Sequence, residues 1–155
     1  MRFTALLACA VLLVACARAE NAPSADSPAA TPTPAAPAAL SLADLAGKWT
    51  QKTYVENTDS LLVTAEVVAT ADPSGWTLTL PGRPPTPLRV TVDGDSIITA
   101  SGPYESVLQK GVQVTTSGVM RMKDGKLVGP TIARYQGVTT ADSVRRLRIE
   151  MTKTP

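Results

Sequence analysis

Histidine is absent from the 155-residue chain, and its two cysteines, Cys9 and Cys16, both lie near the amino terminus. The residues after position 16 therefore lack the side chains of serine-hydrolase triads, cysteine proteases and histidine-based metal or haem sites. They also cannot form a disulfide among themselves, so their fold must depend on apolar burial and strand pairing. We expect no enzyme activity, no catalytic residue, no bound metal and no cofactor.

A strong charge imbalance is also missing. The net charge is +2 for the whole chain and stays +2 for residues 41–155, because Arg2 and Arg18 are balanced by Glu20 and Asp26. A nearly neutral domain lacks the basic surface that phosphate backbones require. We therefore expect no nucleic-acid partner.

Oxygen-based sites are not excluded by composition, but their patterns are incomplete. Asp93 and Asp95 flank Gly94 like part of a calcium loop, yet the further oxygen ligands of such a loop do not follow. We predict a polar hairpin turn there. Alternation along the chain predicts solvated carboxylates, opposite the apolar faces of their strands, at Glu66, Glu105 and Glu150.

No apolar run reaches the roughly 20 residues that a membrane-spanning helix needs. Residues 3–17 are almost continuously apolar and follow the basic Arg2. A basic start before an apolar stretch of about 15 residues is typical of a secretory signal peptide. We predict that residues 1–15 direct export and are removed.

The end of this stretch, Leu13-Val14-Ala15-Cys16, resembles the lipobox of bacterial lipoproteins. In that family a peptidase cuts before the cysteine, whose thiol carries a diacylglyceryl group and whose new amino end is often acylated. The resemblance implies that Cys16 is a lipidation site that anchors the protein to a membrane of the bacterial cell envelope, with enough acyl chains to hold it firmly. Ala17 stands where an aspartate typically retains such proteins at the inner membrane, which favours the periplasmic face of the outer membrane.

Two alternatives remain open for this region. A second candidate motif, Leu6-Leu7-Ala8-Cys9, leaves about six residues between Arg2 and Cys9, fewer than the roughly 7 to 15 of a signal-peptide core. In the other alternative, both cysteines are ordinary small residues of a plain secretory signal peptide. We favour Cys16 as the anchor.

Residues 21–40 consist mainly of alanine and proline, with Asp26 as their single charge. Such a composition cannot bury enough apolar surface to offset chain entropy, and its prolines favour an extended polyproline II conformation. We predict that residues 16–40 form a tether. The folded domain then comprises residues 41–155.

From residue 48 onward, β-branched and apolar residues alternate with polar ones between short breaks rich in Gly, Pro, Asp and Asn. This pattern predicts an all-β, antiparallel up-and-down meander of eight or nine strands, arranged as a barrel or a sandwich. Before the first strand we expect a helical turn over residues 42–46, which Ser41 could cap and Gly47 could end. We also expect a tight hairpin at Asp124-Gly125. Two weaker strands are expected on either side of Gly102-Pro103, over residues 96–100 and 104–108. The residues expected to face inward include Trp49, Leu61, Val67, Trp76, Leu78, Leu80, Leu88, Val90, Met122, Leu147, Ile149 and Met151.

The tripeptide Gly47-Lys48-Trp49, placed after a helical turn at the start of the first strand, resembles the Gly-x-Trp signature of lipocalins. The resemblance favours the barrel over the sandwich and implies that Trp49 plugs its closed end. It also implies an arginine packed across that tryptophan, for which Arg145, on the same strand face as Leu147, is the candidate.

A lipocalin-like barrel implies a binding module for a small apolar ligand. A barrel of about eight strands is either filled by its own side chains or just able to hold one small molecule. The alternative is a structural or protein-interaction module of the envelope that carries no ligand. Small residues expected to face inward either leave room or permit tight strand crossing, and these are Ala65, Ala69, Gly118, Gly129 and Ala133.

Replacing the predicted anchor tests the lipobox directly. In the Cys16→Ser variant we expect the protein to leave the membrane fraction, because the thiol that would carry the diacylglyceryl group is gone. Fractionation of cells expressing the full chain measures this, with Cys9→Ser as the matched control that stays with the membrane. Unchanged membrane association of Cys16→Ser would contradict lipidation at this residue.

Overall fold

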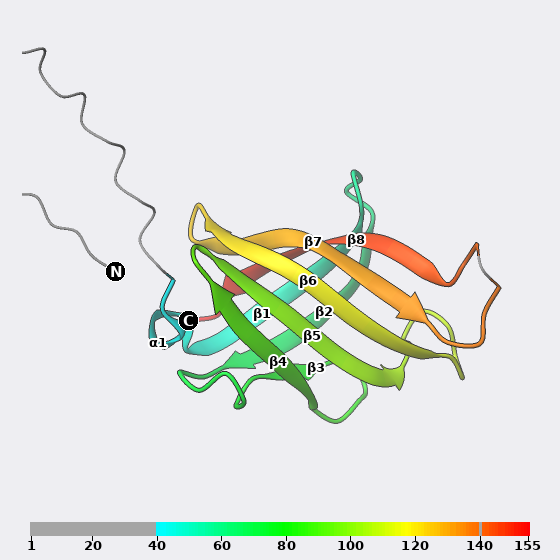
Figure 1. The fold of residues 1–155 in the computed structure, drawn as a ribbon, viewed down its shortest axis with the longest axis horizontal. Coiled ribbons are helices and arrows are strands. Elements are labelled where there is room, and N and C mark those ends of the chain that lie inside the picture. Colours follow the sequence, from blue (N-terminus) through cyan, green and yellow to red (C-terminus); the bar gives the residue numbers. More distant parts are fainter. Residues whose placement is uncertain (1–39, 140) are drawn as a thin grey trace, which may run out of the picture. The chain divides into compact units, whose positions relative to one another are not determined.

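Antiparallel hydrogen bonding joins eight strands into a closed barrel in the computed structural model, which describes residues 40–139 and 141–155 (Figure 1). The predicted signal peptide, Cys16 and all but the last residue of the predicted tether lie outside the described residues. The elements are α1 (Leu42–Leu45), β1 (Gly47–Val55), β2 (Leu61–Ala69), β3 (Thr77–Thr79), β4 (Thr86–Asp93), β5 (Ser96–Glu105), β6 (Gln113–Lys123), β7 (Lys126–Tyr135) and β8 (Val144–Lys153).

Each strand pairs with the next along the chain, and β8 returns to pair with β1. In this register Trp49 lies opposite Val67 of β2 on one side and opposite Lys153 of β8 on the other. The predicted all-β, up-and-down barrel is thereby confirmed, and the sandwich is excluded. Closure leaves the sheet without an unpaired edge strand.

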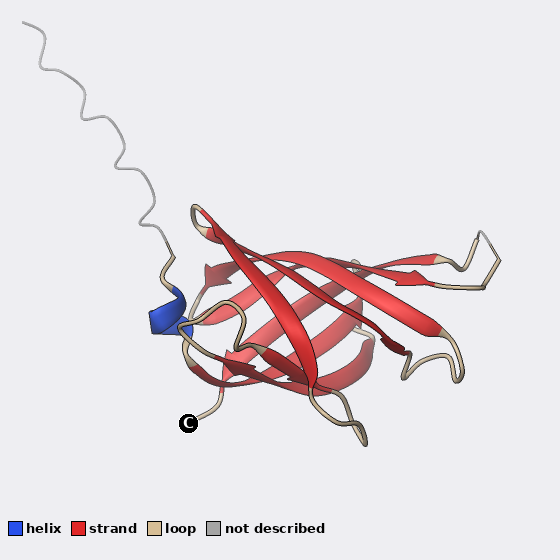
Figure 2. Ribbon diagram, turned by 60° about the horizontal axis from the view of Figure 1, so that its bottom comes forward, coloured by secondary structure: helices blue, strands red, loops and turns tan. Residues whose placement is uncertain are grey.

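The one described helix, α1, is a single turn at one end of the barrel (Figure 2). Its predicted position is confirmed, but the predicted capping is not, because the Ser41 side chain forms no hydrogen bond to the helix. The turn is closed instead by the backbone N–H of Ala46, which donates to the carbonyl of Ala43 at 3.2 Å. Among the described residues, no helix is long and apolar enough to span a membrane.

Both predicted tight hairpins are present. Lys123 pairs with Lys126 across Asp124 and Gly125, whose φ angles are 51° and 75°. Two consecutive positive φ angles match the right-handed twist of the flanking strands, and Gly adopts such an angle without a steric cost. The turn after Asp93 likewise connects β4 to β5.

The prediction of two strands around Gly102-Pro103 is wrong. A single strand, β5, runs through this dipeptide, and its pairing with β6 shifts register between Ser101 and Tyr104. The irregularity lets the strand bend without ending. The segment after Glu105, expected to be strand, forms a loop instead.

Side chains alternate between the barrel interior and its outer face, as the period of two predicts. Most of the residues expected to face inward are buried, including all of those on β3 and β8. Leu61 and Met122 are exceptions, with 50% and 42% of their surface exposed, because each lies at a strand end. A register shift in the β1–β2 pairing also places Leu61 opposite Tyr54, on the outer face, and Leu62 packs inward instead.

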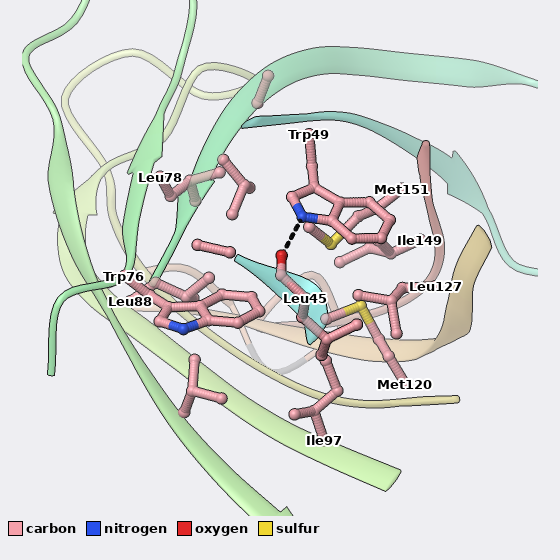
Figure 3. Close-up of a cluster of buried hydrophobic side chains, with 14 of the residues drawn as sticks. Leu45, Trp49, Trp76, Leu78, Leu88, Ile97, Met120, Leu127, Ile149 and Met151 are labelled. Atoms are coloured by element: carbon pink, nitrogen blue, oxygen red, sulfur yellow. Dashed lines mark hydrogen bonds between the residues drawn. The ribbon is translucent and has the colours of Figure 1, made fainter. Parts of the chain in front are cut away.

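The largest buried side chains fill the end of the barrel next to α1 (Figure 3). Trp49 is 1% exposed, and its indole N–H donates to the carbonyl of Leu45 at 2.8 Å. This bond ties α1 to the first strand and satisfies the polar atom of a buried tryptophan. Other members of this cluster are Trp76, Leu78, Leu88, Ile97, Met120, Leu127, Ile149 and Met151.

Two inward-facing glycines permit close packing of β6 against β7 and do not create space. A Cβ at Gly129 would overlap the carbonyl oxygen of Val119, and a Cβ at Gly118 would overlap the hydroxyl of Thr131. Of the two roles left open for the small residues, the structure assigns tight strand crossing to these two glycines.

We expect Trp49→Phe to lower the free energy of unfolding by about 1 to 3 kcal/mol. The substitution removes the hydrogen-bond donor to the Leu45 carbonyl and leaves a void beside α1. The midpoint of urea unfolding measures this loss. Tyr54→Phe is the matched control, since Tyr54 is only half-buried on the outer face, and should change stability by less than about 0.5 kcal/mol. Equal midpoints for Trp49→Phe and the unchanged protein would contradict the role of this bond.

Candidate functional site

The barrel end next to α1 is closed by Trp49, which follows Gly47 as the signature predicts. The prediction that Arg145 packs across this tryptophan is wrong. Lys153 lies there instead, with its Nζ 5.8 Å from the centre of the Trp49 ring and donating to the Asp44 carbonyl at 3.2 Å. The β1–β8 register places Lys153 opposite Trp49, whereas Arg145 is paired with Ala133, several residues away toward the other end.

The opposite end of the barrel, where β1 connects to β2, β3 to β4, β5 to β6 and β7 to β8, contains a cavity of about 60 Å³. Its wall is mainly apolar and has no charged side chain. The lining residues come from seven strands and their connections, among them Val63, Leu78, Leu80, Val114, Ala133, Leu147 and Ile149, with Val107 and Leu108 at its mouth. Ala133 is thus the one predicted small residue that borders an internal space.

A few polar groups face this cavity, and they already have partners. The amide of Gln51 donates to the hydroxyl of Thr53 at 3.3 Å, and the hydroxyl of Thr131 donates to the carbonyl of Ser117 at 3.3 Å. Throughout the described ranges, no buried side-chain nitrogen or oxygen lacks a hydrogen-bond partner. The polar groups of the wall are therefore already hydrogen-bonded within the barrel.

Tyr104 is the titratable group most affected by this environment. Burial raises the pKa of its phenol, and a hydrogen bond with Thr116 opposes that change in part. A raised pKa keeps the phenol neutral and protonated at physiological pH. Tyr104 can therefore offer a hydrogen-bond donor to a guest, but it does not supply a base.

The size of the cavity limits what fits inside. A water molecule needs about 10 to 15 Å³, so a cavity of about 60 Å³ corresponds to roughly four to six non-hydrogen atoms. Sites for drug-sized ligands are typically several times larger. As it stands, the cavity accepts a short molecule or the end of a longer chain.

Exposed apolar side chains lie at this end of the barrel, and Val107 and Leu108 are at the mouth. Val55 and Leu61, at the first connection, and Val144, at the start of β8, have 37%, 50% and 49% of their surface exposed. Val107 and Leu108 are exposed to a similar extent, and both also line the cavity. An apolar guest would therefore meet apolar surface before it enters.

The loop of residues 106–112 contributes Ser106, Val107 and Leu108 to the cavity lining, and its own hydrogen bonds hold it in shape. The Ser106 hydroxyl oxygen accepts the backbone N–H groups of Leu108 and Gln109 at 3.0 and 3.1 Å. The Ser106 N–H donates to the Val112 carbonyl at 2.8 Å and closes the base of the loop. Val107 and Leu108 are thereby held at the mouth.

Glu105 and Arg83 fix this loop to the rest of the barrel. The Glu105 carboxylate accepts the backbone N–H of Gly111 at 2.9 Å and lies 3.5 Å from the Arg83 guanidinium, which also donates to the Ser106 carbonyl at 3.3 Å. The hydrogen bond from Gly111, aided by the positive charge of Arg83, holds the pKa of Glu105 below its usual range. The Glu105 side chain is partly exposed to solvent, as the alternation predicts, and it also holds the loop in place through these contacts.

In the predicted polar turn, the Asp95 carboxylate contacts neighbouring side chains of the barrel. Asp95 accepts the Ser96 hydroxyl at 2.8 Å and pairs with Arg121 at 3.2 Å, and these contacts lower its pKa. The hairpin predicted here is confirmed by the pairing of Asp93 with Ser96. In the part of the chain that the structure describes, no group of three or more Asp or Glu side chains is placed to hold a metal ion.

Comparison with known proteins does not extend this description. No family model matches the chain, and neither a curated protein nor a solved structure shows a significant match. The assignment of a function must therefore come from the barrel itself.

The link between Glu105 and Gly111 predicts a pH dependence. A lowered carboxyl pKa in the folded state means that the bond stabilises the loop at neutral pH and is lost as pH falls through that lowered value. We expect the Gly111 amide signal to titrate in NMR spectra with a midpoint below the ordinary glutamate pKa, and Glu105→Gln to abolish the titration. A midpoint at or above the ordinary value would contradict the link.

Proposed function

We propose that the protein is an exported lipoprotein of the bacterial envelope whose barrel binds one small apolar molecule through its open end. The observation that carries the binding function is the cavity with a largely apolar, uncharged wall inside the barrel. Burial of apolar surface contributes about 25 cal/mol per Å², so even a short chain gains affinity by entering.

The difference between the two barrel ends supports this proposal. At one end Trp49, Trp76 and Leu45 are almost completely buried and fill the interior. At the other end the interior is not filled, and apolar side chains remain exposed.

The anchoring part of the proposal depends on the sequence. The Leu13-Val14-Ala15-Cys16 motif supports lipidation at Cys16 and a location at the periplasmic face of the outer membrane. An anchored binding module would hold its ligand close to the membrane surface. Its predicted partners are the membrane, through the acyl chains, and the small ligand.

A protein-interaction module without ligand is the second candidate, and one observation favours it. A hollow of about 250 Å³ lies on the outer face of β5, β6 and β7, bordered by Ile98, Val119, Pro130 and Ile132. Ile98 and Val119 are paired across the strands and are 40% and 37% exposed. Exposed apolar patches of this kind occur at protein interfaces, and crosslinking in intact envelopes would capture such a partner.

A variant that fills the cavity tests the binding function. Ala133 is 2% exposed and lines the cavity, so Ala133→Val places two additional methyl groups in the space a guest would occupy. We expect 1-hexanol to shift the amide signals of Thr131 and Tyr135 in NMR titrations of the unchanged protein. The affinity should fall at least tenfold in Ala133→Val.

The matched control is Ala100→Val, the same change on the outer face of β5, which should leave hexanol binding unaltered. Urea unfolding of both variants checks that the barrel remains intact. Absence of any hexanol response in the unchanged protein, or equal binding by Ala133→Val, would overturn the proposed interior site. Shifts confined to Ile98, Val119 and Ile132 would assign binding to the outer hollow instead.

A further inference from the structure

Arg145 lies at the mouth of the barrel, on the inward-facing side of β8. It is paired with Ala133 and shares its strand face with Leu147, and both of these residues line the cavity. Its guanidinium carbon is 5.8 Å from the centre of the Tyr135 ring, another part of the cavity wall. The side chain is exposed to solvent.

Two arginines close to this end of the barrel are neutralised by carboxylates. Arg83 pairs with Glu105 at 3.5 Å, and Arg148 pairs with Asp59 at 3.4 Å and Glu150 at 3.9 Å. No carboxylate of residues 40–139 or 141–155 forms an ion pair with Arg145. Arg134 and Arg146 lack one as well, but they lie on the outer face, whereas Arg145 is on the inward-facing side of its strand. One positive charge is thus available beside an apolar cavity that contains none.

We propose that the ligand is a short-chain monocarboxylate, with its apolar chain in the cavity and its carboxylate on Arg145. This inference rests on the proposed function. The planar guanidinium can donate two parallel hydrogen bonds to a carboxylate, and a single unpaired cation balances a single negative charge. The cavity volume of about 60 Å³ suits a chain of roughly four to six carbons.

The polar groups of the wall are consistent with this orientation. The cavity lining contains hydroxyl and amide groups that already have partners, and burial keeps the Tyr104 phenol neutral. An ionised carboxylate would lose its hydration there without gaining an opposite charge. At the mouth it keeps part of its water and gains the contact with Arg145.

The test compares hexanoate with 1-hexanol, which has a chain of the same length and no charge. Each compound is titrated by NMR at pH 7 into three samples, which are the unchanged protein, Arg145→Gln and Arg146→Gln. Arg146 is the matched control, because it is adjacent in sequence, lies on the outer face of β8 and also lacks an ion pair. We expect hexanoate to bind more tightly than hexanol, and Arg145→Gln to weaken hexanoate about tenfold while hexanol is unaffected.

Two results would overturn the inference and leave the proposed function in place. One is equal binding of hexanoate and hexanol with no effect of Arg145→Gln, and the other is an equal loss of hexanoate affinity in both variants, which would indicate a general effect of net charge. If neither compound binds the unchanged protein, the interior site itself is refuted. Preference for hexanoate that is lost only in Arg145→Gln supports a carboxylate site at the mouth.

Discussion

The pairing of β1 with β8 is the constraint on which the rest of the molecule depends, because it closes the sheet and creates an inside. The domain contains no histidine and no cysteine. A disulfide bond or a metal site built from those residues therefore cannot take the place of this pairing. Closure satisfies the backbone groups of both outer strands and encloses the apolar face of every strand. It also determines which residues meet across the seam.

Within the closed barrel, side-chain volume decides the character of each end. Trp49, Trp76 and Leu45 fill one end. The hydrogen bond from Trp49 to the Leu45 carbonyl attaches the helical turn there. Toward the other end smaller residues such as Ala133 and Thr131 face inward, and a cavity remains. The same fold thus has one end that is filled by side chains and another end that contains a cavity.

The charged residues at this end of the barrel also differ in their contacts. Arg83 and Glu105 neutralise each other and hold the loop of residues 106–112, so their charges serve the structure. Arg145 has no such partner and lies against Tyr135 beside the cavity. The two arginines therefore differ in role, since one fixes a loop and the other carries a charge that takes part in no ion pair.

Local pattern in the sequence determined the strand faces, the hairpin at Asp124-Gly125 and the place of Trp49, because alternation and turn chemistry act over a few neighbouring residues. The candidate anchor Cys16 and the expectation of an interior ligand also came from the sequence alone. Only the tertiary structure decided that Lys153, and not Arg145, covers Trp49. It likewise decided that β5 continues through Gly102 and that a cavity remains beside Ala133. These features depend on the register between strands far apart in the chain and on how side chains fill a closed volume. The alternation of side chains along a single strand gives information about neither.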